Sequence, residues 1–234
     1  MTEETLQPHF ASAFSLAVSA PRFAAFQKDG NEREALARYL WNVALCEALY
    51  PAFHTLEVGF RNAVHRELGV FHGDPTWLIS HDAFLKASEQ DSIRSAENSL
   101  LRHHKPVTEP RLVAELSFGF WTSLLDRRYD QIWPQIIRRV FPLMPRKMRT
   151  RANISAMMQP IRRLRNLAFH HHAIWDRNDL GATHTSAITL IGWMSGPLVA
   201  SLGRIDRFPA TLSGGLEPYL EHVLQLMPYP NLPQ

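Results

Sequence analysis

A basic segment with three consecutive histidines contains the residue types best suited to chemistry. It reads RNLAFHHH over residues 165–172 and has no acidic residue. On a helix, Arg162, Asn166 and His170 would form one row, because residues four apart lie on the same side. Histidine can accept or donate a proton near neutral pH, arginine can stabilise the charge on a phosphate, and asparagine can position either group. These types permit metal-independent cleavage of RNA, whose ribose 2′-OH is the nucleophile; alternatively, they only line a polar groove.

The same histidines do not predict a metal site. Neighbouring side chains on a helix point about 100° apart, so residues 170–172 cannot converge on one ion. A second group, His72, Asp74, His81 and Asp82, surrounds an expected turn without a recognised ligand spacing, and we expect turn and capping roles for it. No Gly-rich phosphate loop is present. The sequence therefore indicates neither a metal nor a cofactor.

The charge distribution favours a polyanionic partner. The formal net charge is +3, with a pI near 9.2. Clustered arginines without carboxylates are typical of phosphate binding, although arginine stems can also cover apolar surface. We expect Arg162, Arg163, His171 and His172 to contact the RNA backbone. Between residues 131 and 175 the charged residues are all basic: Arg138, Arg139, Arg146, Lys147, Arg149, Arg151, Arg162, Arg163 and Arg165.

Hydrophobic residues recur every three or four positions, which predicts an all-α protein with a helical bundle as its architecture. Residues 36–64 predict a long helix that Pro51 breaks or kinks. No linker divides the chain, so we expect a single domain over residues 1–234. Further helices are expected at residues 83–103, 109–129, 153–176 (with Pro160 as a kink or a new start), 183–203 and 216–226.

Two features concern the compartment. The single cysteine, Cys46, fits a reducing environment, and the cytoplasm is the expected location. The apolar segment 180–203 approaches the length of a membrane span but is diluted by Thr, Ser, Gly and Pro197. We therefore expect a buried helix and no membrane partner, with membrane association as the weaker interpretation.

The stretch RLRNLAFHHHAIW (residues 163–175) resembles the C-terminal motif of the Abi-like (abortive-infection) family in the HEPN superfamily. That motif has Arg, then usually Asn, then His five residues after the Arg, and Arg165, Asn166 and His170 occupy these positions. Residues 38–69, GDPTWL at 73–78 and residues 113–129 resemble earlier blocks of the family. The resemblance covers about residues 36–178, and residues 1–30 are expected to be loosely ordered. Phe169 stands where the family commonly has a small residue.

The resemblance implies a HEPN-like helical bundle with additional peripheral helices, and a homodimer formed through the helix that carries residues 161–176. It implies a metal-independent endoribonuclease of a bacterial phage-defence or toxin type that leaves 2′,3′-cyclic phosphate ends. His170 would be the general acid or base, Arg165 would stabilise the phosphate and Asn166 would position the reacting groups. An antitoxin could be a partner. The alternative is a non-catalytic RNA-binding or protein-interaction module on the same fold.

Two expectations follow from helical geometry alone. Phe169 and Ala173 would project on the polar side of the helix, where a second copy of the same helix could cover them. Glu57 and Arg61 are four residues apart and would share a face. They either form an ion pair with each other, or act as supporting residues that orient His170 or Arg165.

Overall fold

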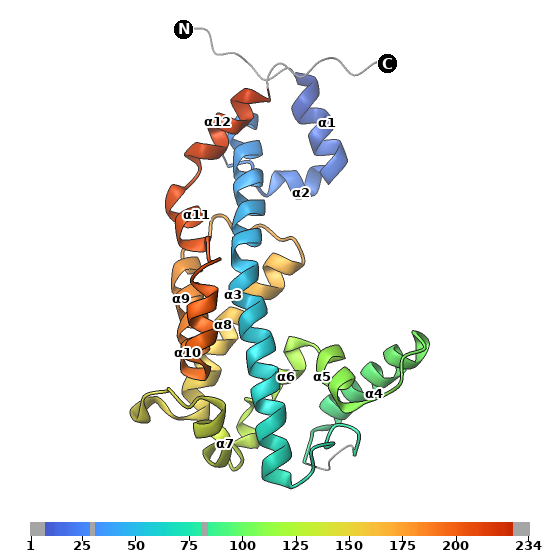
Figure 1. Ribbon diagram of the computed structural model, residues 1–234. Coiled ribbons are helices and arrows are strands. Elements are labelled where there is room, and N and C mark those ends of the chain that lie inside the picture. Colours follow the sequence, from blue (N-terminus) through green and yellow to red (C-terminus); the bar gives the residue numbers. More distant parts are fainter. Residues whose placement is uncertain (1–7, 29–30, 81–83, 227–234) are drawn as a thin grey trace. The chain divides into compact units, whose positions relative to one another are not determined.

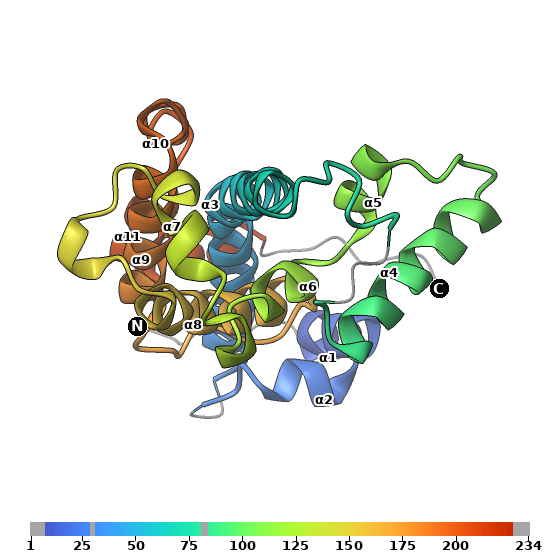
Figure 2. The ribbon, with the colours of Figure 1, turned by 90° about the horizontal axis from the view of Figure 1, so that it is seen from below.

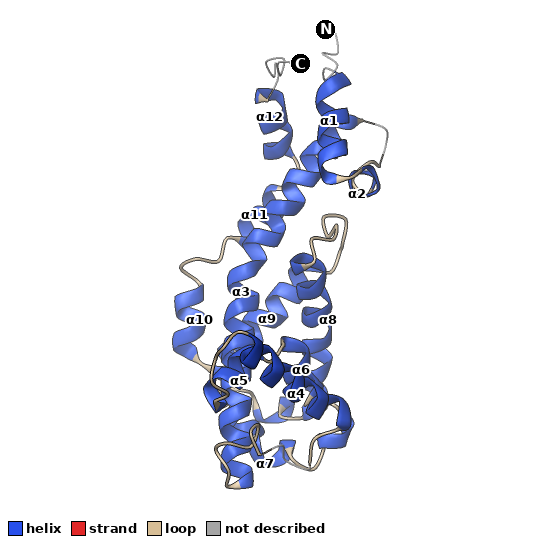
Figure 3. Ribbon diagram, turned by 90° about the vertical axis from the view of Figure 1, so that its right-hand side faces the viewer, coloured by secondary structure: helices blue, strands red, loops and turns tan. Residues whose placement is uncertain are grey.

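The computed structural model describes residues 8–28, 31–80 and 84–226, and over these ranges it contains helices but no strand (Figures 1 and 3). The all-α prediction is confirmed. The α-helices are α1 (Pro8–Val18), α2 (Ala20–Ala24), α3 (Glu32–His72), α4 (Ala87–Arg102), α5 (Glu109–Glu115), α6 (Phe118–Ser123), α7 (Trp133–Val140), α8 (Arg151–Phe169), α9 (Leu180–Met194), α10 (Gly196–Leu202), α11 (Phe208–Gly214) and α12 (Glu217–Gln225), and the 3-10 helices are η1 (Arg127–Tyr129) and η2 (Arg146–Met148).

The chain divides into two compact units. Unit 1 comprises Met1–Tyr50, Asn166–Gly181 and Asp206–Gln234, and unit 2 comprises Pro51–Arg165 and Ala182–Ile205. The boundaries pass through α3 and α8, so each of these helices contributes one part to each unit. Arg165 therefore belongs to unit 2, whereas Asn166 and the three histidines belong to unit 1.

Aromatic residues organise the N-terminal helices of unit 1. The ring of Phe14 lies edge-on to Phe23 and Tyr39, with centroids 5.5 and 5.1 Å apart, and Phe26 lies 5.2 Å from Tyr39. Phe23 and Phe26 are almost completely buried, together with Val223 of α12. This burial explains why residues 8–24, which were expected to be loosely ordered, instead form α1 and α2. Residues 1–7 and 29–30 of that segment lie outside the described ranges.

Unit 2 has a core rich in tryptophan. Phe60 on α3 stacks on Trp133 at 6.5 Å and contacts Phe141 at 6.1 Å. Trp77 and Trp121 meet edge to face at 6.3 Å. Figure 2, which views the C-terminal part of α3 nearly end-on, shows α5, α6 and α7 around it. These large buried rings fix the part of α3 that carries Glu57 and Arg61.

Pro51 does not break α3, a helix of 41 residues that continues on both sides of it. A proline inside a helix removes one backbone hydrogen bond and introduces a steric clash. The neighbouring Leu49, Ala52 and Phe53 are almost fully buried, and their packing offsets that cost. Pro160 likewise lies inside α8.

Three other expected helices have different boundaries. The helix expected over residues 109–129 is divided into α5 and α6, because Leu116 is extended and the Ser117 hydroxyl accepts a hydrogen bond from the Phe120 N–H at 3.3 Å as an N-cap. Segment 183–203 is divided into α9 and α10, with Ser195 as the N-cap of α10. Within the described ranges, none of the helices combines the length and apolar character needed to span a bilayer. The third difference, at the end of α8, changes the candidate site.

Candidate functional site

Helix α8 ends at Phe169, seven residues before the expected end at Asp176, in a Schellman motif. The His171 N–H donates to the Ala168 carbonyl at 3.1 Å, and the His172 N–H donates to the Leu167 carbonyl at 2.9 Å. His171 has φ 60°, in the left-handed region that non-glycine residues seldom adopt. The chain therefore turns sharply inside the histidine run, and His171 and His172 lie beyond the end of the helix.

His170 keeps the relation to Asn166 that helical spacing predicts. Its N–H donates to the Asn166 carbonyl at 3.0 Å, which is the last such bond of α8. The side chains of His170, His171 and His172 are exposed, as is that of Asn166. The three imidazoles are thus accessible to a solute.

A buried asparagine fixes the chain just after the histidines. Asn42 on α3 is 5% exposed, and its side-chain oxygen accepts from the N–H groups of Ile174 at 2.7 Å and Trp175 at 3.2 Å. Its amide nitrogen donates to the His172 carbonyl at 3.4 Å. One side chain therefore satisfies three backbone groups of the segment 172–175. Sequence reasoning missed this residue, because its partners lie about 130 positions away in the chain.

Basic side chains of unit 1 also contact the segment that follows α8. The Arg22 guanidinium donates to the His171 carbonyl. The Arg38 guanidinium lies over the Trp175 ring at 5.3 Å, and the Lys28 ammonium lies 6.0 Å from the same ring. Such cation–π contacts stabilise an aromatic side chain that has one face partly open. Residues 171–175 thus form an anchored turn.

Phe169 and Ala173 are covered within the chain. The Phe169 ring stacks on Tyr50 with centroids 5.6 Å apart, and Ala173 packs against the buried cluster of unit 1. A second copy of the helix is therefore not required to cover these two residues, since α8 ends at Phe169 and does not continue past it. The stacking also shows how a large side chain is accommodated at position 169.

On the other side of the boundary, Arg165 of unit 2 forms an ion pair with Glu57. The Arg165 Nη2 and Glu57 Oε2 atoms are 3.2 Å apart, and the two side chains are 23% and 18% exposed. A guanidinium held by a partly buried carboxylate loses much of its rotational freedom. Of the two expectations for Glu57, the structure therefore shows the contact with Arg165.

Arg61, the other expected supporting residue, contacts a different element. Its Nη1 donates to the carbonyl of Ala114, in α5, at 3.4 Å. Its Nε is buried and has no hydrogen-bond partner among the described residues. Arg61 therefore links α3 to α5.

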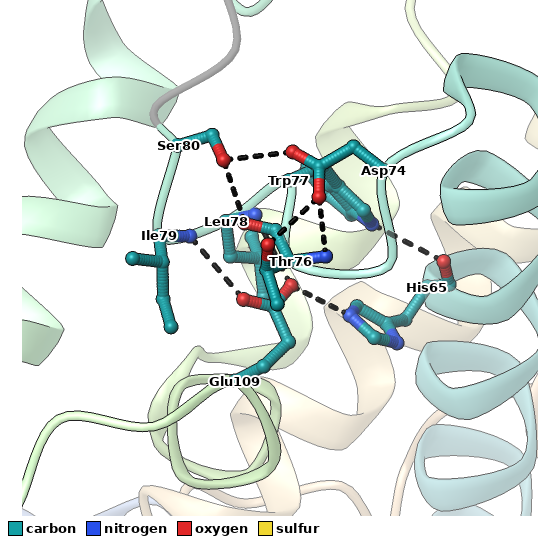
Figure 4. Close-up of polar contacts among 8 residues, drawn as sticks. All are labelled: His65, Asp74, Thr76, Trp77, Leu78, Ile79, Ser80 and Glu109. Atoms are coloured by element: carbon teal, nitrogen blue, oxygen red, sulfur yellow. Dashed lines mark hydrogen bonds and ion pairs between the residues drawn. The ribbon is translucent and has the colours of Figure 1, made fainter.

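A buried acid and histidine pair organises the turn that follows α3 (Figure 4). Glu109 accepts from the N–H groups of Leu78 at 3.1 Å and Ile79 at 3.2 Å, and lies 2.8 Å from His65 Nε2. The His65 carbonyl accepts from the indole N–H of Trp77 at 3.2 Å. Sequence reasoning missed the role of Glu109, which is structural: it closes the turn onto α3.

Asp74 has the turn-forming role expected of it. Its carboxylate accepts from the Thr76 N–H at 2.8 Å and from the hydroxyls of Thr76 and Ser80, both at 2.7 Å (Figure 4). These hydrogen bonds, that from Ser80 foremost, lower the Asp74 pKa below its ordinary value. His81 and Asp82 lie outside the described residues. Within the described part of the chain, no three His, Cys, Asp or Glu side chains are grouped so as to hold a metal.

The basic residues between 131 and 165, which lie in unit 2, fall into two groups according to their contacts. Some are structural: Arg139 pairs with Glu67 at 2.7 Å, Arg151 pairs with Asp130, and Arg149 donates to the Met144 carbonyl at 2.8 Å. Others are exposed and have no acidic partner among the described residues, and only these can provide an uncompensated positive surface. They are Arg138, Arg146, Lys147 and Arg163; Arg162 is half-buried.

The sequence model of the Abi-like protein family matches residues 8–176, which is well over half of the chain. This chain is a member of the Abi-like protein family. The match runs from the start of α1 to the end of the anchored turn, so it includes both Arg165 and the histidines. Membership associates this Abi-like protein with abortive infection, a defence against phage. No curated protein and no solved structure is similar enough to be matched to it.

Proposed function

We propose that this Abi-like protein is a metal-independent endoribonuclease of the HEPN type, with Arg165, Asn166 and His170 as its catalytic residues. The proposal rests on two properties of the motif residues, the exposure of His170 and the ion pair that restrains Arg165. His170 is exposed at the end of α8, and Arg165, five residues earlier, is held by Glu57 at 3.2 Å. An accessible proton-transfer group and a restrained cation are what cleavage of a phosphodiester requires.

The reaction uses the substrate's own nucleophile. The ribose 2′-OH attacks the adjacent phosphorus, the bond to the 5′-oxygen breaks, and the products are a 2′,3′-cyclic phosphate and a 5′-hydroxyl. His170 exchanges a proton with the entering or the leaving oxygen. Arg165 stabilises the negative charge that develops on the phosphate, and Asn166 positions the phosphate by hydrogen bonding.

Cleavage requires two proton transfers, one from the 2′-OH and one to the leaving oxygen. A homodimer that pairs the α8 helices, as the family resemblance implies, would supply a second His170 for the other transfer. Arg162, Arg163, His171 and His172 would bind the RNA backbone near the motif. The protein would act in the cytoplasm as a phage-defence toxin, and an antitoxin would be its protein partner.

The exposed cations Arg138, Arg146 and Lys147 favour a second candidate, an RNA-binding protein that does not cleave. They have no acidic partner among the described residues, and clustered cations bind RNA whether or not a reaction follows. The two candidates differ in a single measurable property, the integrity of the bound RNA.

The decisive experiment is incubation of purified protein with mixed RNA in EDTA, followed by analysis of fragment ends. Wild type should produce cyclic-phosphate ends, whereas His170→Ala and Arg165→Ala should lose at least about 100-fold in rate. His104→Ala and Arg204→Ala, which change exposed residues of unit 2 outside the motif, are the controls and should cleave normally. Intact RNA that is retained by all five proteins would favour the binding module and exclude the catalytic roles.

A further inference from the structure

Unit 1 contains a pocket beside the anchored turn. Its volume is about 400 Å³, within the range of small-molecule sites. The end of α1, the chain around α2 and one side of α3 form its walls, and the histidine turn contributes one residue. The lining residues are Ala17, Val18, Arg22, Phe26, Tyr39, Asn42, Val43, Cys46 and His171.

The lining is divided between apolar and polar groups, and this division defines the ligand chemistry. Phe26 and Tyr39 supply aromatic surface, and Val43 adds an aliphatic wall. The basic side chains of the lining are Arg22 and His171, and no lining residue is acidic. A ligand that fits should therefore have a flat apolar part and a negative charge.

Asn42 lines the pocket, but its side chain is not available to form hydrogen bonds with a ligand. Its oxygen and its nitrogen are both engaged with the backbone of residues 172–175. Arg22 donates to the His171 carbonyl, but a guanidinium has five N–H groups and keeps others for a ligand. Arg22 and His171 are thus the basic groups that face a ligand, and basic groups bind phosphate without reading a base sequence.

The backbone of His171 is the strained element of this pocket. A non-glycine residue at φ 60° costs energy that the surrounding contacts must compensate, and such residues cluster at ligand-binding positions. Here the Arg22 contact and the Schellman bonds compensate it. The turn places an exposed imidazole at the rim of the pocket instead of continuing α8.

We propose that this pocket binds a nucleoside phosphate, with the base against Phe26 and Tyr39 and the phosphate between Arg22 and His171. Stacking on aromatic rings is tolerant of base identity, and arginine is well suited to phosphate oxygens. The ligand is a nucleotide of the RNA chain or a free nucleotide. In the first case the proposal rests on the ribonuclease function and identifies a substrate subsite next to His170 in the chain.

The test measures binding directly, by titration calorimetry of the full chain with AMP. Val43→Trp should fill the pocket and weaken AMP binding at least ten-fold, because Val43 lines it and is 50% exposed, so the change need not disturb the core. Val70→Trp is the matched control, since Val70 is an exposed valine on the same helix, outside the pocket lining, and should change the Kd less than two-fold.

Further ligands separate the contributions of base and phosphate. Adenosine and inorganic phosphate should each bind at least ten-fold more weakly than AMP, and Arg22→Gln should weaken AMP but not adenosine. AMP should also slow the alkylation of Cys46, the single cysteine of the chain, which lines the pocket. Absence of AMP binding at millimolar concentration, or equal effects of Val43→Trp and Val70→Trp, would overturn the proposal.

A second arm distinguishes the two sources of the ligand and keeps this proposal separate from the ribonuclease. If the pocket is an RNA subsite, Val43→Trp should raise the KM for single-stranded RNA at least five-fold, and AMP should compete with RNA. If free nucleotide is the ligand, AMP binds but does not compete. Binding of AMP without any RNA cleavage would leave the pocket established and the ribonuclease excluded. RNA cleavage by a wild-type protein that does not bind AMP would give the reverse result.

Discussion

The carboxylate of Glu57 lies 3.2 Å from the guanidinium of Arg165, so a residue of α3 restrains the arginine of the family motif on α8. Both side chains are mostly buried, which makes the pair stronger than one in open solvent. The pair is therefore suited to hold Arg165 in place before substrate binds.

Replacement of Glu57 by Gln tests this positioning role. Loss of the charge should weaken the restraint on Arg165, lower kcat for RNA cleavage about ten-fold and destabilise the fold by about 1 kcal/mol. Glu57→Asp should recover part of the rate, which a purely structural role would not predict. Single-turnover cleavage and urea unfolding measure the two effects.

Glu47→Gln is the control for this variant. Glu47 lies on α3, as Glu57 does, and pairs with Arg207 at 2.7 Å. This ion pair is exposed, since the two side chains are 65% and 70% accessible. Little change is expected in either measurement. Wild-type kinetics in Glu57→Gln would show that the ion pair has no part in positioning Arg165.

Asn42, although far from the histidine turn in the sequence, should keep that turn ordered through its hydrogen bonds. Asn42→Ala leaves the N–H groups of Ile174 and Trp175 without their acceptor, and a buried unsatisfied group costs about 1–3 kcal/mol. We expect a loss of about 3 kcal/mol in the free energy of unfolding and faster hydrogen exchange at these two amides. Asn62→Ala, at an exposed position of α3, should change neither. Unchanged exchange at residues 174 and 175 would contradict the role assigned to Asn42.

Helical periodicity was sufficient to predict the class and most of the elements, because the buried positions of α3, such as Leu49, Phe53, Leu56 and Phe60, repeat every three or four residues. It could not predict the end of α8. Where a helix ends in the left-handed conformation, the residue at that position is usually glycine, and here it is a histidine.

The supports of the site were predictable only in part. Glu57 and Arg61 were visible as charged residues on one face of a helix, and Glu57 does contact Arg165. Asn42 and Arg22 gave no local signal, since each contacts a segment well over a hundred residues away. Their roles depend on tertiary packing, which a periodic pattern does not encode.

The turn centred on Asp74 should give the protein a specific sensitivity to acid. Hydrogen bonds from Ser80 and Thr76 hold the folded-state pKa of Asp74 below its ordinary 3.8. The ionised Asp74 carboxylate therefore stabilises the folded state fully at a pH above its unfolded-state pKa. This stabilisation is lost as the pH falls through the lower, folded-state pKa. The difference in stability between wild type and Asp74→Asn should be largest near pH 6 and shrink toward zero in strong acid.

Urea midpoints measured across that pH range, with Ser80→Ala beside them, test this expectation. Ser80→Ala removes the donor with the largest effect on the pKa and should show part of the same pH dependence. A difference between wild type and Asp74→Asn that is constant with pH would show that the turn does not depend on the ionised carboxylate.

His171→Gly should separate strain from function in the histidine turn. Glycine adopts φ 60° without the cost of a side chain, so the variant should gain about 1 kcal/mol in stability after its own entropic cost, or about 2–4 °C in Tm. It should nevertheless bind AMP and RNA more weakly, because the imidazole at the pocket rim is lost. His104→Gly is the matched control, since His104 has φ 53° just after α4, in unit 2, and should raise the Tm without any effect on binding. A His171→Gly protein with wild-type affinity for both ligands would show that the left-handed histidine only ends the helix.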